Sequence, residues 1–426
     1  MIANPGASYD CVIIGGGPAG ATAGAVLGMH GRRVVILERE RFPRPHIGES
    51  LMPATYHTFQ RIGMLDQLTG AGFCRKQSVQ FVTATGKESS PFYFPDWDPS
   101  ESSSTWQVQR DRFDQLMLDN ARAKGATICH PARAHRVLFD GERATGVRAD
   151  VAGTPTDIRA KVVIDASGQA AVLANQLGIR RTEPRFRNGA IYAYYENAVR
   201  DTGRNAGATI VITTPDRMGW FWFIPLSDTL TSVGLVGPPQ YLFSGRGDDP
   251  AATLEAQITA CPAIARRLAP ADRISQASVT RDFSYHAAQI AGDGWILIGD
   301  AFGFLDPVYS SGLMLALKSG EWAADAVHDA IEHDDCSAAR LGAFGDRFVA
   351  GMHLLRKMLY AFYDPDFSFG RFTRAHPECR DHLIRMLIGD VFNDEVGTLF
   401  DTMSRWVKLP DTIDSIGLNT GGTEPA

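Results

Sequence analysis

The feature that most constrains the fold is a glycine-rich turn between two short apolar segments near the N-terminus. Residues 11–14 and 33–37 are apolar enough to form buried strands, and residues 19–29 are small residues suited to a tightly packed helix. The first strand is followed by Gly15-Gly-Gly-Pro-Ala-Gly20, and the second by Glu38. This order of strand, glycines, helix, strand and acid is the fingerprint of a dinucleotide-binding α/β unit.

The three glycines of the fingerprint have separate tasks. Gly15 permits the tight turn, Gly17 lets the backbone approach a pyrophosphate, and Gly20 allows close packing of helix on strand. We expect the helix N-terminus at Ala19 to face the phosphates with free N–H groups. Glu38 is expected to accept hydrogen bonds from the adenosine ribose hydroxyls.

Two later segments extend the same sheet. Residues 161–165 form an apolar run that leads into a turn, and residues 295–300 repeat this pattern and end in Gly-Asp. The second segment resembles the second FAD motif of glutathione-reductase-type flavoproteins, which implies that Asp300 binds the ribityl or pyrophosphate part. We therefore expect a discontinuous, Rossmann-like FAD-binding domain within residues 1–330, assembled from about 1–60, 107–170 and 275–330.

The remaining segments have other patterns. Short alternating runs between residues 171 and 275 predict an antiparallel sheet that covers the flavin, and the inserted substrate region comprises about 61–106 and 171–274. Residues 331–409 have helical periodicity. Residues 410–426 are polar and glycine-rich, which predicts a disordered tail.

Composition argues against several classes of function. A net charge of −6 without a basic block argues against nucleic acid as a partner. The six cysteines are scattered and form no C-x-x-C pair, which argues against a metal site, a redox dithiol or a disulfide framework. The sequence shows neither a signal-peptide pattern nor an apolar run of the ~18–20 residues that span a membrane. It therefore predicts a cytoplasmic protein with no membrane span.

The rarest element is the hexapeptide Trp220-Phe-Trp-Phe-Ile-Pro225, since the whole chain has 7 tryptophans in 426 residues. In a strand, alternation places Trp220 and Trp222 on one face and the two phenylalanines on the other. The alternative is an ordinary strand that buries large aromatic side chains.

Together with the glycine turn, this hexapeptide resembles the flavin-dependent halogenases, in which W-x-W-x-I-P accompanies an N-terminal FAD fingerprint. The resemblance covers about residues 9–395. It implies that FADH2, O2 and chloride or bromide yield a flavin C4a-hydroperoxide and then hypohalous acid, which halogenates an electron-rich aromatic molecule. A second NAD(P)H fingerprint is missing, so a separate flavin reductase is expected. Trp220 and Trp222 would keep the organic substrate away from the flavin, which separates halogenation from hydroxylation.

The resemblance continues in residues 38–50, where the family follows the acid with a basic run and then H-x-G-E-S. Arg110 resembles the R-x-x-F-D arginine that contacts FAD; the alternative for Arg110 or Arg112 is a surface salt bridge. The motifs together predict these cofactor-binding residues: Gly15, Gly17, Ala19, Gly20, Glu38, Arg39, Ile47, Gly48, Glu49, Ser50, Arg110, Asp300, Pro307 and Gly312. Among them, Gly48 and Glu49 are expected at the phosphate and ribityl part.

Lys76 is the expected catalytic residue. The family has a lysine after a G-F-x-x-K phrase, present here at residues 72–76. A desolvated amine can lose its charge and then hold the oxidant or become a chloramine, whereas arginine stays charged. The alternative is a solvated surface lysine, with Arg75 as the buried residue instead.

Residues 302–312 resemble the D-P-V-x-S-x-G element of the same family. Pro307 would lie along the isoalloxazine ring, and the amides of Ser311 and Gly312 at a helix start would bind the halide. The alternative is an ordinary serine-glycine helix cap. Tryptophan halogenases have a glutamate where this chain has Tyr309, so the resemblance favours a phenol or pyrrole substrate, which relatives often receive tethered to a carrier protein.

The sequence leaves two other functions open. One is an FAD-dependent monooxygenase or a geranylgeranyl-reductase-like oxidoreductase of the same superfamily, in which Lys76 and the tryptophans are structural. The other is a flavoprotein that binds a partner without turnover. The intact glycines, Glu38 and Asp300 argue against that last function.

Overall fold

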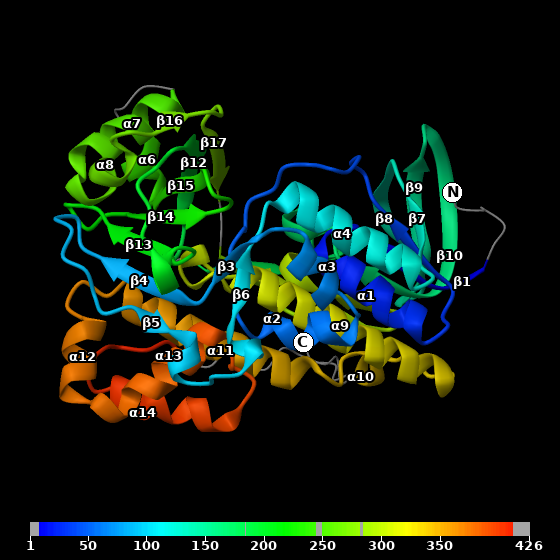
Figure 1. Ribbon diagram of the computed structural model, residues 1–426. Helices are drawn as coiled ribbons and strands as arrows, with labels where there is room; N and C mark the ends of the chain where they lie inside the picture. The colour runs from blue at the N-terminus through cyan, green and yellow to red at the C-terminus, as the bar shows by residue number, and fades with distance from the viewer. Residues whose placement is uncertain (1–7, 184, 244–248, 282–283, 412–426) are drawn as a thin grey trace.

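The structure is a computed structural model that describes residues 8–183, 185–243, 249–281 and 284–411. Figure 1 shows two large sheets, with the C-terminal helices in orange and red beneath one of them. Two small sheets accompany them, one of β11 (Arg180–Thr182), β18 (Tyr285–Ala287) and β21 (Gly303–Phe304) and the other of β3 (Cys74–Lys76) and β6 (Thr105–Gln107). From residue 412 onward, the tail that we expect to be disordered lies outside the described residues.

The strand β1 (Tyr9–Ile14) is central to the first sheet. It pairs in parallel with β2 (Val34–Leu37) on one side and with β10 (Thr154–Asp165) on the other. The parallel order continues to β7 (Thr127–Cys129) beyond β2 and to β20 (Trp295–Leu297) beyond β10. All four residues of β2 are buried and apolar, as is typical of a strand inside a parallel sheet.

Two further strands extend this sheet. β8 (Ala132–Asp140) and β9 (Arg143–Val151) form an antiparallel meander on the first half of β10. The second half of β10 pairs with β1 and β20, so one long strand joins the meander to the parallel part.

The helix α1 (Pro18–Met29) packs against both α4 (Arg110–Ala123) and α9 (Ser311–Glu332) beside the first sheet. The contact of α1 with α9 is close because both helices have small residues there. A Cβ atom at Gly320 would lie 2.5 Å from the carbonyl oxygen of Ala19. This contact joins the N-terminal fingerprint to a segment three hundred residues later.

The second sheet has the strand order β16-β12-β15-β14-β13-β4-β5, with β17 also paired to β12. Its strands are β4 (Ser78–Val82), β5 (Phe92–Tyr93), β12 (Gly189–Glu196), β13 (Thr209–Thr213), β14 (Trp220–Pro225), β15 (Leu230–Gly237), β16 (Asp272–Arg273) and β17 (Ser278–Arg281). β13 and β4 pair in parallel, with Val211 opposite Phe81. The sheet that we expect to be antiparallel is therefore mixed at this pair.

Three further helices were not predicted from the sequence: α6 (Pro239–Phe243), α7 (Pro250–Ala260) and α8 (Pro262–Leu268). They cover the second sheet at the top left of Figure 1. Leu254 and Ile264 share a core with Phe221 and Phe223. A signal was present: the Asp249 side chain accepts a hydrogen bond from the N–H of Ala251, and Pro250 occupies the first turn of α7.

The assignment of residues 61–106 to the substrate sheet also needs correction. Part of this segment forms α3 (Leu65–Gly70), which follows α2 (Thr55–Arg61), and α2 packs on α9. β3 (Cys74–Lys76) and β6 (Thr105–Gln107) form a separate two-stranded ribbon. Only β4 and β5 of this segment join the second sheet.

The helical region expected at 331–409 is present in the described residues. It comprises α10 (Ala338–Leu341), α11 (Gly345–Phe362), α12 (Phe369–Ala375), α13 (Arg380–Ile388) and α14 (Leu399–Met403). Leu355, Met358 and Leu359 form part of the buried stripe of α11. In the described part of the chain, no helix combines the length and apolar character needed to cross a membrane.

Candidate active site

A cavity of about 680 Å³ lies where the strands of the first sheet end. Residues that directly follow β1, β2, β10 and β20 line it, which is the edge at which open α/β sheets bind ligands. The expected cofactor-binding residues that line it are Gly15, Gly17, Ala19, Glu38, Arg39, Ile47, Gly48, Arg110, Asp300 and Gly312.

The glycines of the first turn differ in what surrounds them. Gly15 has a φ of +103°, and a Cβ atom there would lie 2.4 Å from the carbonyl oxygen of Ala166. A Cβ atom at Gly20 would lie 2.0 Å from the carbonyl oxygen of Gly15, so Gly20 packs against the turn and is not among the residues that line this cavity. At Gly17 a Cβ atom would meet only Nη2 of Arg44, at 3.6 Å. The space above Gly17 therefore belongs to the cavity.

Glu38 shapes the same turn. One carboxylate oxygen accepts a hydrogen bond from the N–H of Gly16 at 2.7 Å, and the other accepts one from the N–H of Glu40 at 2.8 Å. The buried carboxylate still lines the large cavity. Each oxygen has a second lone pair, so both can also accept from ribose hydroxyls.

Arg110 is buried and holds the loop of residues 46–49 in place. Its guanidinium donates to both carboxylate oxygens of Asp114, at 2.7 and 3.0 Å. Nη1 donates to the carbonyl oxygens of Ile47 and Gly48, at 2.6 and 3.0 Å. The surface salt bridge considered for Arg110 is wrong, because Arg110 and Asp114 are both buried. Arg112, the other candidate, donates to the carbonyl oxygen of Ala71 near the surface.

Arg44 is not among the predicted cofactor-binding residues, although it lies in the basic run after Glu38. Its guanidinium borders the open space above Gly17 and lies 3.3 Å from the Asp114 carboxylate. Nη1 is the atom that forms this ion pair, without hydrogen-bond geometry, and Nε lies 3.4 Å from the Glu40 carboxylate. A half-buried cation beside the N-terminus of α1 suits the pyrophosphate of a dinucleotide. The residues of the large cavity therefore fit FAD.

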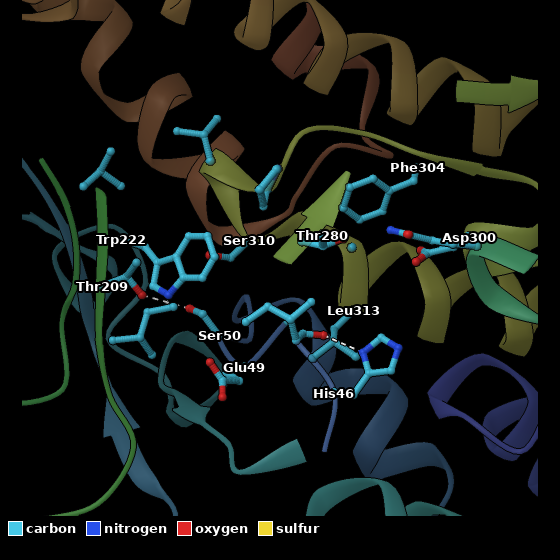
Figure 2. A pocket seen from close by; sticks show the side chains of 18 of the residues that line it. His46, Glu49, Ser50, Thr209, Trp222, Thr280, Asp300, Phe304, Ser310 and Leu313 are labelled. Atoms are coloured by element: carbon cyan, nitrogen blue, oxygen red, sulfur yellow. Dashed lines mark hydrogen bonds between the residues drawn. The ribbon is translucent and has the colours of Figure 1, made fainter. Parts of the chain in front are cut away.

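A second cavity, of about 100 Å³, shares a wall with the first. Asp300 and Gly312 line both cavities, whereas Glu49, Ser50 and Pro307 line only the smaller one. Burial raises the pKa of Asp300 to about 7, and Arg110 acts in the opposite direction. Figure 2 shows how the side chains converge on this cavity from the loop between β2 and α2 (residues 46–50), from the second sheet and from the start of α9.

Trp220, Trp222 and Ile224 form one wall of the smaller cavity. Phe221 and Phe223 lie on the opposite face of β14, in the core beneath α7 and α8. The alternation expected for the hexapeptide is thus observed. The two indole rings are 6.3 Å apart, and the Trp222 N–H donates to the Ser232 hydroxyl at 3.1 Å.

Glu49 lies at this wall and not with the phosphate-binding turn. One of its oxygens accepts a hydrogen bond from the Tyr194 hydroxyl at 2.8 Å, and the other has no hydrogen-bond partner. Burial raises the pKa of Glu49 to about 7. Glu49 therefore lies beside the tryptophans in the smaller cavity, and its contact with the phosphate and ribityl part stays a prediction.

Lys76 lies outside both cavities but is joined to the smaller one through Ser50. The ammonium group donates to the Ser50 hydroxyl at 2.8 Å and to the carbonyl oxygen of Leu51 at 2.9 Å. The side chain is buried, and this burial lowers its pKa to about 7. The alternative of a surface lysine is wrong. Arg75 is exposed and stacks on Trp106, so it is not the buried partner.

The turn that leads into α9 carries the expected halide residues. Ser310 has a φ of +59°, and α9 begins at Ser311. Gly312 lines both cavities, whereas Ser311 is buried and lines neither. Tyr309 is buried as well, and its hydroxyl donates to the carbonyl oxygen of Met358 in α11. In the described ranges, no cluster of three or more metal-ligating side chains is found.

The fold and the cavity define an FAD-binding oxidoreductase. Residues 8–321 match the family described as FAD binding domain. A 1H-pyrrole-2-carbonyl-(peptidyl-carrier protein) brominase from Pseudoalteromonas luteoviolacea is 32% identical over 390 residues, 91% of this chain and 93% of the relative. The tryptophan 2-halogenase of Chondromyces crocatus is also 32% identical, over 84% of this chain and 68% of its own length.

Solved structures show the same relationship. The flavin-dependent brominase Bmp2 is similar with a TM-score of 0.84 and 29% identity, covering 94% of this chain and 99% of that one. The myxobacterial chondrochloren halogenase CndH is similar with a TM-score of 0.79 and 35% identity, covering 91% of each chain. The chain belongs to the flavin-dependent halogenases. It is a flavoprotein enzyme that halogenates, and neither the monooxygenase nor the reductase alternative is favoured.

Proposed function

We propose that this enzyme halogenates a pyrrole or phenol ring, with Lys76 as its catalytic residue. The observation that carries this proposal is the buried amine of Lys76, which is one hydrogen bond away from a serine that lines the smaller cavity. A lysine with a pKa near 7 is partly neutral at neutral pH. A neutral amine can donate a hydrogen bond to hypohalous acid, or take up the halogen and release water.

The chain's own residues divide the remaining tasks. When bound, reduced FAD together with O2 supplies the oxidising equivalent that converts halide to an electrophilic halogen. Gly17 and Arg44 would hold the pyrophosphate, Glu38 the ribose, and Pro307 the ring end. The amides at the start of α9 would hold the halide, where Gly312 reaches the cavity.

The tryptophan wall would keep the organic substrate from the flavin. Trp220 and Trp222 occupy the side of the smaller cavity that faces the second sheet. The two indoles would close the flavin side of this space to a ring on a carrier arm and leave room for a small inorganic oxidant. Transfer of the halogen to the organic substrate would then take place beside Lys76, away from the flavin.

The substrate class follows from the relatives and from one substitution. The relatives include pyrrole-2-carbonyl brominases and chlorinases that act on a peptidyl carrier protein. Tyr309 replaces the glutamate that tryptophan halogenases use to orient an indole. A phenol or pyrrole is electron-rich enough to need no such carboxylate. We propose a carrier-tethered ring as the first substrate to test, with reduced flavin supplied by a separate reductase.

The test is incubation with FAD, a flavin reductase, NADH and chloride or bromide. The acceptors are pyrrole-2-carbonyl on a peptidyl carrier protein, free pyrrole-2-carboxylate and a set of phenols, and mass spectrometry reads the halogen isotope pattern. We expect halogenated product that depends on Lys76 and is absent with Lys76→Met. Oxygenated or reduced product without halogen would contradict the proposal.

A further inference from the structure

The hydroxyl of Tyr363, directly after α11, lies at the centre of a buried hydrogen-bond network. It accepts a hydrogen bond from the indole N–H of Trp220 at 2.9 Å and from the side-chain amide of Asn188 at 3.0 Å. It donates to Oδ2 of Asp306 at 2.6 Å. The network joins four segments that are far apart in the sequence.

The direction of every hydrogen bond in this network is determined. An indole N–H only donates, and so does the amide nitrogen of Asn188. Asp306 accepts from Tyr363, from Asn188 at 2.9 Å and from the backbone N–H of Val308 at 3.1 Å. Burial raises the pKa of Asp306, and these three donors oppose that rise by stabilising the carboxylate form. Tyr363 therefore uses its single proton on Asp306 and both lone pairs on its neighbours.

The two ends of the network lie at the smaller cavity. Trp220 is part of the tryptophan wall, and Asp306 immediately precedes the turn of Pro307 and Val308, which lines the same cavity. Asp306 also caps this turn through its bond to Val308. The turn leads into Gly312, the expected halide residue. One hydroxyl group thus connects the wall to the turn.

We propose that Tyr363 is a positioning residue. It fixes the position of the tryptophan wall (Trp220 and Trp222) relative to the turn of residues 306–312 that carries the expected halide site. This inference rests on the proposed function of the wall and of the turn. A short O–H···O⁻ hydrogen bond is among the strong ones in proteins, so Tyr363 holds Asp306 tightly and presents a fixed acceptor to Trp220. The C-terminal helical region therefore contributes to the flavin side of the site, although it lines neither cavity.

The first test needs no cofactor. The sequence has 7 tryptophans, so indole ¹⁵N labelling gives few resonances, and Trp220 is assigned by its loss in Trp220→Phe. We expect the Trp220 N–H to be protected from exchange in the wild type and unprotected in Tyr363→Phe. Asp306→Asn should shift the same resonance, although Asp306 does not touch Trp220. An unchanged Trp220 resonance in both variants would overturn the proposal.

The second test separates two effects of one hydroxyl. Tyr363→Phe should raise the hydrogen peroxide released per flavin oxidised severalfold, since the wall loosens. It should also raise the halide concentration for half-maximal rate about tenfold, the scale of one hydrogen bond to a charged group. Trp220→Phe should raise only the release of hydrogen peroxide and leave the halide dependence unchanged. The double variant of Trp220→Phe and Tyr363→Phe should release no more peroxide than Tyr363→Phe alone.

Tyr309→Phe is the matched control. It also removes a buried tyrosine hydroxyl between the same turn and α11, but that hydroxyl binds the carbonyl oxygen of Met358 and not Trp220. We expect no increase in peroxide release from this variant. An equal leak in Tyr309→Phe would show a general loss of packing and would overturn the proposal. If the wild type makes no halogenated product, the proposed function fails, while the indole exchange result still decides the role of Tyr363.

Discussion

Lys76 shows how burial makes an ordinary side chain reactive. Its pKa is lowered to about 7 because the ammonium form loses hydration that the Ser50 hydroxyl and the Leu51 carbonyl only partly replace. The neutral form becomes more populated as the pH rises through this value. A halogen transfer that needs the neutral amine should therefore speed up between about pH 6 and 8 and level off above, because its pKa falls inside that range.

The first prediction is that Lys76→Met abolishes halogenated product but stabilises the protein. Methionine keeps an apolar stem without the amine. Between the folded pKa of about 7 and the ordinary value of 10.5, the unfolded chain binds a proton that the folded chain does not. The free energy of unfolding therefore rises with pH in this window. At pH 7 the buried lysine lowers it by on the order of a few kcal/mol. Urea unfolding of the wild type and Lys76→Met at pH 7 and pH 10 measures the difference in their free energies of unfolding. If the advantage of the variant is as large at pH 10 as at pH 7, the titration of Lys76 does not explain it.

Gly17 and Gly20 provide a contrast within one turn. We predict that Gly17→Val leaves the apo fold intact and weakens FAD binding severely, because its side chain would extend into open space needed by the pyrophosphate. Flavin retention after gel filtration measures the loss. Gly20→Ala is the comparison, because its methyl group would collide with the Gly15 carbonyl and lower the melting temperature itself. Normal flavin retention in Gly17→Val would show that the pyrophosphate lies elsewhere.

At the scale of an element, the strand β14 serves two environments because its side chains alternate. The indoles line the smaller cavity, and Phe221 and Phe223 fill the core under α7 and α8. Alternation could be predicted from the sequence because it depends only on the geometry of a strand. The helices on the other side could not be placed, since their position depends on residues thirty or more positions away.

A prediction follows for this strand. Trp222→Ala should lower the free energy of unfolding by roughly 3–5 kcal/mol, the usual loss for truncating a buried tryptophan. It should also increase peroxide release per reduced flavin, because the wall opens. Phe223→Leu is a control on the opposite face that should affect stability without the leak. If Trp222→Ala is less stable but releases as much peroxide as the wild type, Trp222 has only a packing role.

At the scale of the whole molecule, the large cavity is built from segments between Ile14 and Ala316. FAD binds only when these segments are assembled, so it should stabilise the folded state. At a free FAD concentration about one hundred times Kd, the gain is about 2.7 kcal/mol. A thermal scan with and without FAD measures this gain, and Gly17→Val should abolish it. An equal shift in that variant would place the cofactor outside this cavity.

How much the sequence could predict depends on how local each signal was. The FAD-binding α/β fold and the halogenase family are confirmed, because the fingerprint around Gly15 and the hexapeptide at Trp220 are continuous in the chain. Arg44 lay inside a quoted motif, yet only its position above Gly17 distinguishes it from other arginines. Tyr363 had no local signal, because its importance comes entirely from partners 57 to 175 residues away.

The pairing of β1 with β10, and of β10 with β20, has a consequence for synthesis of the chain. The fingerprint leaves the ribosome first, but its strand partners at 162–165 and 295–297 follow much later, and α9 later still. Contacts of such long sequence separation form slowly. The nascent N-terminal segment therefore has no complete flavin site to fill until about residue 320 has emerged, and cofactor loading belongs to the last stage of biogenesis.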